Sequence, residues 1–207
     1  MKLNHPLPRS IVFDGCTYRL RLAFDNVLRV FEVQHEPLFD DAQRLQLSVE
    51  LLAGRRAGRL PLEKLARLME RISAEFLSPK SPPRKPGEPR VLDWLQDAPY
   101  IYASFQQAYG IDLTKQRGRL DWRYFVALFQ GLPENTKIRE VMSIRSRPLP
   151  SPAPMTADQA RAEQAKAMLE LKAFYAIEIS EDEARQNFQD GVNAFAQSLI
   201  GRAKRGV

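Results

Sequence analysis

The stretch from Asp97 to Arg145 constrains the fold most, because its apolar side chains recur at helical spacing between clear start and stop signals. Gly110 follows the first pattern and can adopt the positive φ that ends a helix. Asp121 precedes the second pattern and suits an N-cap. A third pattern ends at Ile144–Arg145. We therefore predict three helices here, the first two forming a buried core from Ile101, Phe105, Ala108, Tyr109, Trp122, Phe125, Val126 and Phe129.

The residues before this stretch predict a hairpin and further helices. Asp14-Gly15 is a two-residue turn signal inside the β-favouring run from Ile11 to Leu20. Helical patterns follow over 22–33, from an Asp40 or Asp41 cap to Gly54, after Pro61, and over 90–96. The predicted fold is mainly α: a short N-terminal β-hairpin, a compact bundle of about six helices, and a C-terminal helical hairpin.

Two proline-rich segments divide the chain. We predict a mostly helical core domain over 1–147 with an extended loop at 78–90, a linker at 148–154, and a helical hairpin over 155–207. The last helix of that hairpin carries an apolar seam at coiled-coil spacing, made of Phe188, Val192, Phe195 and Leu199. Two short amphipathic helices are marginal alone in water, so this hairpin must dock on the core, pair with another copy, or hold a client helix.

Composition and motifs argue against several classes of protein. No apolar run approaches the roughly 20 residues that cross a bilayer, and the N-terminus lacks the apolar core of a secretory signal. We expect a cytoplasmic protein that does not bind membranes. Cys16 is the one cysteine, and His5 and His35 have no neighbours at metal-ligand spacing. Helix caps and turns explain Asp93, Asp97 and Asp112 better than acid–base chemistry does, so we expect no catalytic residue, metal or cofactor.

The net charge of +6 raises the question of nucleic acid. Residues 1–154 carry 24 Lys+Arg against 17 Asp+Glu, whereas residues 155–207 carry 7 against 8. The basic excess is spread over short groups, most of them in predicted loops: Arg55, Arg56 and Arg59; Arg84 and Lys85; Lys115 to Arg119; and Arg145 with Arg147. None alternates with aromatic residues as RNA-binding sheets do, so solvated loops are favoured over a nucleic-acid surface.

The same central stretch resembles a known phage family. Tyr100 to Leu113, Leu120 to Pro133, Thr136 and Ile144-Arg145 are similar to the family named after gene product fifteen, whose members are encoded in the tail-morphogenesis region of long-tailed phages and prophages. The resemblance extends more weakly upstream and covers roughly the first 147 residues. The proline-rich insert and the long C-terminal extension depart from the family, and Asp121 stands where many relatives would have histidine.

This resemblance implies a non-enzymatic tail-assembly chaperone that binds the tape-measure protein and tail-tube subunits, self-associates, and leaves before the virion matures. The work of such a protein needs exposed apolar grooves rather than a reactive group. The candidate partner-binding residues are the C-terminal seam Phe188, Val192, Phe195 and Leu199, together with Tyr102 and Tyr124, which lie off the buried stripes. The alternatives are a basic nucleic-acid-binding accessory protein and a structural tail component retained in the virion.

Overall fold

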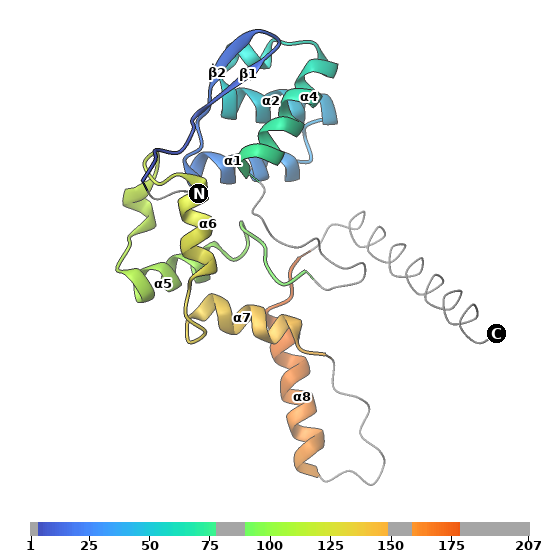
Figure 1. Cartoon of the computed structure of the whole chain (residues 1–207). Coiled ribbons are helices and arrows are strands. Elements are labelled where there is room, and N and C mark those ends of the chain that lie inside the picture. The colour runs from blue at the N-terminus through green and yellow to red at the C-terminus, as the bar shows by residue number, and fades with distance from the viewer. Residues whose placement is uncertain (1–3, 78–89, 149–158, 179–207) are drawn as a thin grey trace, which may run out of the picture. The chain divides into compact units, whose positions relative to one another are not determined.

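The computed structural model describes residues 4–77, 90–148 and 159–178. The chain divides into two compact units. The first unit comprises Met1–Ser81 and Ile101–Pro133, and the second comprises Pro82–Tyr100 and Glu134–Val207. The fold is mainly helical with a short N-terminal β-hairpin, as the sequence predicts (Figure 1).

The hairpin of the first unit forms where Asp14-Gly15 predicts it. Strands β1 (Ser10–Phe13) and β2 (Cys16–Arg19) pair antiparallel, and both turn residues have positive φ, 47° and 72°. Aspartate and glycine tolerate this left-handed conformation, which matches the twist of the flanking strands. Side chains of α4 hold the hairpin, through an ion pair from Lys64 and a hydrogen bond from the Arg71 guanidinium to a β1 carbonyl.

Four helices and a π-helical turn follow in the first unit: α1 (Phe24–His35), α2 (Asp41–Ala53), α3 (Arg55–Gly58), α4 (Leu62–Ile72) and η1 (Ser73–Leu77). Figure 1 shows α1, α2 and α4 grouped beside the hairpin. Asp40 and Gln43 make a reciprocal capping box at the start of α2, as predicted from a cap at this position. The sequence did not predict α3, whose arginines we expected in a loop.

The rest of the first unit supplies its aromatic core. Helix α5 (Ala98–Tyr109), of which all but the first three residues belong to this unit, ends at Gly110, where φ is 65°. The 3-10 helix η2 (Leu113–Gln116) and helix α6 (Trp122–Gln130) follow. The Phe125 ring stacks on the rings of Phe24, Phe105 and Trp122, with centroids at 5.0, 5.1 and 5.5 Å. The predicted stripe of α6 is therefore buried as expected.

Trp122 adds a polar anchor to this core. Its ring is 3% exposed, and the indole Nε1–H donates to the Leu77 carbonyl over 2.9 Å. This bond satisfies a backbone acceptor at the last residue of η1, where the helix leaves carbonyls without partners of its own. The position of Trp122 is fixed by packing and by hydrogen bonding together.

The second unit contains α7 (Lys137–Ser146) and α8 (Gln159–Phe174), in addition to the segment that precedes α5. The short helix predicted over Arg90–Gln96 is wrong, because the structure has irregular chain and a turn there. The Asp93 carboxylate accepts hydrogen bonds from the amides of Leu95 and Gln96, so a side chain replaces the carbonyl acceptors of a helix. Trp94 lies half-buried in this turn.

Several predictions fall partly or wholly outside the described residues. Helix α8 confirms the first helix of the predicted C-terminal hairpin. The second helix, with its seam of Phe188, Val192, Phe195 and Leu199, lies outside the described residues. So do most of the linker and all of the predicted loop over 78–90 except Arg90. The predictions for these residues therefore stay predictions.

Candidate binding surfaces

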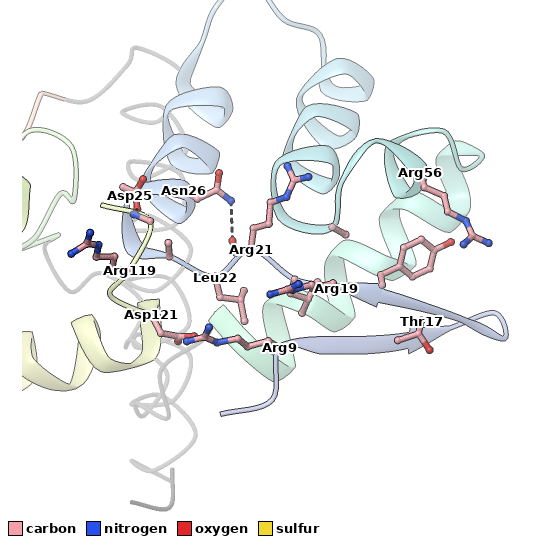
Figure 2. A pocket seen from close by; sticks show the side chains of 15 residues that line it. Arg9, Thr17, Arg19, Arg21, Leu22, Asp25, Asn26, Arg56, Arg119 and Asp121 are labelled. Atoms are coloured by element: carbon pink, nitrogen blue, oxygen red, sulfur yellow. Dashed lines mark hydrogen bonds and ion pairs between the residues drawn. The ribbon is translucent and has the colours of Figure 1, made fainter. Parts of the chain in front are cut away.

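The first unit contains a pocket lined by arginine side chains, with a volume of about 720 Å³ (Figure 2). This volume lies in the range of pockets that bind small molecules or short peptide segments. Among the described residues, five arginines line the pocket: Arg9, Arg19, Arg21, Arg56 and Arg119. All five side chains are exposed, so their charged groups reach solvent at the pocket.

Extended backbone geometry explains why β2 and the residues just after it contribute two arginines, Arg19 and Arg21. From Thr17 to Leu22 exposed and buried residues alternate, with Thr17, Arg19 and Arg21 exposed and the residues between them buried. Successive side chains of an extended chain point to opposite faces, so these three share the solvent face. The buried side chains of the same segment pack in the core, so the arginine side chains on its opposite face are left to line the pocket.

Backbone hydrogen bonds bring the remaining arginines to this face. The Leu20 amide donates to the Arg9 carbonyl over 2.8 Å, and the Arg21 amide donates to the Leu52 carbonyl at the end of α2, just before α3 and Arg56. The loop that carries Arg119 is tied to the start of α1 by the Phe24 amide, which donates to the Leu120 carbonyl over 2.9 Å. Four separate parts of the sequence thus converge on one pocket.

The carboxylates in the pocket wall already have partners. Asp25 accepts from the Gly118 amide over 2.8 Å. Asp121 is buried and accepts from the Arg123 side chain and amide, with Arg9 at 4.0 Å. Within the described part of the chain, no carboxylate pairs with Arg19, Arg21, Arg56 or Arg119. The pocket therefore presents unpaired positive charge.

This convergence corrects our prediction that the basic residues are spread over separate solvated loops. Arg56 and Arg119 belonged to separate sequence groups, and Arg9, Arg19 and Arg21 belonged to none. The alternation Thr17-Tyr-Arg-Leu-Arg-Leu22 was the available signal, since it predicts two arginines on one strand face. The contacts with α3 and with the Arg119 loop are non-local and leave no such signal.

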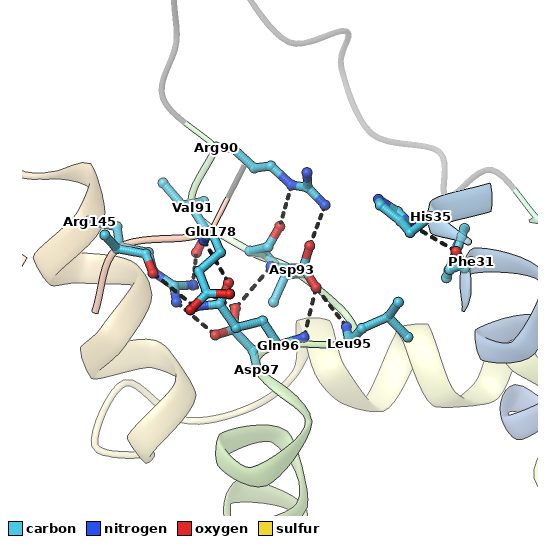
Figure 3. A network of polar contacts seen from close by, with 12 residues as sticks. Phe31, His35, Arg90, Val91, Asp93, Leu95, Gln96, Asp97, Arg145 and Glu178 are labelled. Atoms are coloured by element: carbon cyan, nitrogen blue, oxygen red, sulfur yellow. Dashed lines mark hydrogen bonds and ion pairs between the residues drawn. The ribbon is translucent and has the colours of Figure 1, made fainter. Parts of the chain in front are cut away.

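A buried ion pair organises the second unit (Figure 3). The Arg145 guanidinium donates two hydrogen bonds to the Asp97 carboxylate, over 2.5 and 2.8 Å, and the two side chains are 5% and 0% exposed. Arg145 also donates to the carbonyls of Val91 and Tyr175. This arginine was expected among the solvated basic residues, and instead it joins three chain segments in a buried site.

The same network holds the described C-terminal segment on α7. The Lys172 ammonium donates to the Arg145 carbonyl over 3.0 Å, and the Gln96 amide group bonds both the Ala176 carbonyl and the Glu178 amide. The Lys137 ammonium lies 5.1 Å from the centre of the Tyr175 ring. Hydrogen bonds that the Lys137 ammonium donates to Tyr175 and then to Glu140 raise the pKa of Lys137. The part of the C-terminal region that the structure describes therefore docks within its own unit.

Docking leaves apolar side chains of α8 exposed. Leu169 is 48% exposed, Leu171 43% and Phe174 75%. Leu171 and Phe174 are three residues apart and therefore neighbours on the helix surface, whereas the half-buried Met168 and Tyr175 lie on the docked side. An exposed phenylalanine beside an exposed leucine is a candidate contact for another chain.

The aromatic residues predicted at the surface differ in exposure. Tyr102 on α5 is 39% exposed, whereas Tyr124 on α6 is half-buried. Both therefore reach solvent to some degree, and partner binding through them stays a prediction. The other predicted partner-binding residues, Phe188, Val192, Phe195 and Leu199, lie outside the described chain.

The carboxylates considered for acid–base chemistry each have a local structural partner. Asp93 pairs with Arg90, and Asp97 pairs with Arg145. Asp112 caps η2 and accepts from the Thr114 hydroxyl over 2.6 Å, a bond that lowers the pKa of Asp112. Among the described residues, no three histidine, cysteine or acidic side chains are grouped to hold a metal ion. None of the described helices is long and apolar enough to span a membrane.

Comparison with known families places the chain in a phage context. The family model described as bacteriophage Gp15 protein matches residues 3–177. The chain belongs to this family. No curated protein and no solved structure gives a significant match. The Gp15 match extends past residue 147, where we expected the resemblance to end, and takes in α8.

The described surfaces fall inside the Gp15 match and the predicted seam falls outside it. The arginine-lined pocket, the Asp97–Arg145 pair and the exposed residues of α8 all lie within 3–177. Phe188 to Leu199 follow the matched region. Surfaces that belong to the Gp15 domain itself are therefore separable by position from the extension.

Proposed function

We propose that this phage protein is a non-catalytic tail-assembly chaperone that binds the tape-measure protein and tail-tube subunits. Membership of the bacteriophage Gp15 protein family is the observation that carries the proposal, together with the tail-morphogenesis role that the resemblance implies. The chaperone acts in the cytoplasm of the bacterial host and is absent from the mature virion. A structural tail component, by contrast, would stay in the particle.

The exposed apolar residues of α8 support a protein-binding role. A tape-measure protein offers long helical segments, and a helix buries its apolar face against apolar side chains such as Leu171 and Phe174. The binding must be reversible, since the chaperone is replaced during assembly. A small exposed apolar site fits this requirement better than a large buried interface does.

Co-expression with the tape-measure protein of the same phage tests the proposal. We expect the full chain to keep the tape-measure protein soluble and to co-purify with it. Phe174→Glu should reduce the co-purified amount several-fold, because a buried carboxylate has no partner there. Leu38→Glu is the matched control, since Leu38 is 86% exposed on the first unit and should leave binding unchanged.

Two results would contradict the proposal. An unchanged solubility of the tape-measure protein in the presence of the wild-type chain would remove the chaperone role. Stoichiometric recovery of the chain in purified mature particles would support a structural tail component instead. Quantitative mass spectrometry of purified particles measures the second outcome.

A further inference from the structure

The arginine-lined pocket has the chemistry of an anion-binding site. Arginine presents a planar fork of N–H donors that binds carboxylates and phosphates with two parallel hydrogen bonds. Arg19, Arg21, Arg56 and Arg119 have no carboxylate partner within the described chain. Of the two aspartates in the wall, Asp121 pairs with Arg123 and lies 4.0 Å from Arg9, and Asp25 accepts from the Gly118 amide. The repulsion among these guanidinium groups is relieved when an anion enters.

The distribution of the charges favours an extended ligand over a compact ion. Figure 2 shows Arg119 beside Asp25 at one end of the pocket and Arg56 at the other, with Arg9, Arg19 and Arg21 between them. A single phosphate would need several guanidinium groups to converge on one point. Charges spread along a pocket of about 720 Å³ instead match a segment with several carboxylates.

The wall of the pocket does not favour nucleic acid. Proteins that bind single strands combine positive charge with exposed aromatic rings on which bases stack. Tyr18 is the aromatic residue among the described lining residues, and it is 6% exposed. Without a stacking surface, the carboxylates of a protein are the better match for these arginines.

We propose that the arginine-lined pocket binds an acidic segment of a partner protein through carboxylate–guanidinium pairs. This proposal rests on the proposed function in one respect, since both take the partner to be a protein. It adds a second, electrostatic contact in the first unit to the apolar contact on α8. The two contacts use different residues, so each can be removed without the other.

Titration calorimetry of the full chain with a hexaglutamate peptide tests this site at low ionic strength, where exposed charges are least screened. The variant that replaces Arg19, Arg21 and Arg119 with glutamine should weaken binding by about tenfold or more, because each lost pair is a charge-assisted bond. The matched control replaces Arg29, Arg59 and Arg147 with glutamine. These residues are exposed, lie outside the pocket and change the net charge equally, so the control should bind within about twofold of wild type.

A single Arg119→Gln variant keeps the test valid if the triple variant fails to fold. It should weaken binding about threefold, since one of several pairs is lost. Three results would overturn the proposal: no heat of binding with hexaglutamate, equal losses in the pocket and control variants, or tighter binding of a thymidine oligonucleotide or pyrophosphate through the same arginines. Failure here leaves the tape-measure test of α8 unaffected, because that test uses Phe174→Glu.

Discussion

The two units of the chain are stabilised by different kinds of contact. In the first unit, rings from three helices stack around Phe125, and Leu52, Val27 and Leu68 are fully buried. In the second unit, Arg145 and Asp97 form a buried ion pair that also binds backbone carbonyls. An apolar core tolerates small changes of shape, whereas a buried charge requires each of its partners.

In the first unit the main contacts contribute stability, whereas in the second unit the buried ion pair mainly fixes one arrangement of the chain segments. Apolar burial stabilises the first unit through many contacts, each of them small. The Asp97–Arg145 pair loses hydration on burial, so its net stabilisation is modest, but it admits one arrangement of the segments that it joins. The second unit should therefore depend on a single side chain more than the first does.

The largest expected effect is in the aromatic core. Phe125→Ala should lower the free energy of unfolding by about 4 kcal/mol, because it removes a 1% exposed ring and leaves a cavity between Phe24 and Phe105. Urea denaturation followed by circular dichroism measures it. Phe174→Ala is the control, since this ring is 75% exposed and should cost less than about 0.5 kcal/mol.

Arg145→Met should destabilise the second unit by about 3 kcal/mol, because it leaves the Asp97 carboxylate buried without its cation. Hydrogen exchange should show faster opening of α7, with the amides of α1 unchanged. Adding Asp97→Leu should recover part of the loss, since no charge then remains buried. Recovery stays incomplete because the Val91 and Tyr175 carbonyls lose their donor. Equal exchange effects in both units would refute the comparison.

A helix cap in the first unit provides a medium-sized effect. Asp40→Ala should cost about 1 kcal/mol, because the Asp40 carboxylate accepts from the Gln43 amide at the start of α2. Asp41→Ala is the neighbouring control, in which a fully exposed carboxylate is removed and the cap is kept. Thermal unfolding of the two variants measures the difference. Identical midpoints would mean that the capping box contributes nothing.

The smallest effect is the pH dependence of the Asp14–Lys64 ion pair. Hydrogen bonding from Lys64 lowers the pKa of Asp14, so its stabilisation is present above the unfolded pKa of about 3.9 and is lost as pH falls through the folded pKa. Lys64 has a raised pKa, so its contribution is lost as pH rises through that value. Asp14→Asn should be slightly less stable than wild type at pH 7.

The gap between wild type and Asp14→Asn should close as the solution is acidified below about pH 4. Asparagine tolerates the positive φ of this position, so the variant tests charge rather than backbone strain. Urea titrations at several pH values measure the gap. A gap that is independent of pH would show that the ion pair does not contribute.

Local signals in the sequence predicted most of the first unit. Asp14-Gly15, the Asp40 cap, Gly110 and the Asp121 cap each act within a few residues, and each appears in the structure where predicted. The prediction of a short helix over Arg90–Gln96 was wrong because the Asp93 carboxylate, rather than backbone carbonyls, accepts from the Leu95 and Gln96 amides. Helix propensity alone does not predict whether a side-chain carboxylate or a backbone carbonyl will accept from these amides.

The candidate sites were less predictable because they depend on distant parts of the chain. Arg145 meets a carboxylate 48 residues away, and a periodic pattern cannot indicate such a pair. The pocket joins Arg9 to Arg119 through the hairpin and the start of α1. The alternation around Arg19 and Arg21 was the one part of the pocket that the sequence could predict. It places both arginines on one face but does not indicate which other segments lie beside that face.

The chain contains two tryptophans, and they fall one in each unit. Trp122 is enclosed in the aromatic core of the first unit, whereas Trp94 is half-buried in the turn of the second. Each unit thus carries its own intrinsic chromophore. In single-tryptophan proteins made by Trp94→Phe or Trp122→Phe, the emission wavelength reports the loosening of one unit alone, so a client's effect on each can be followed without any attached dye.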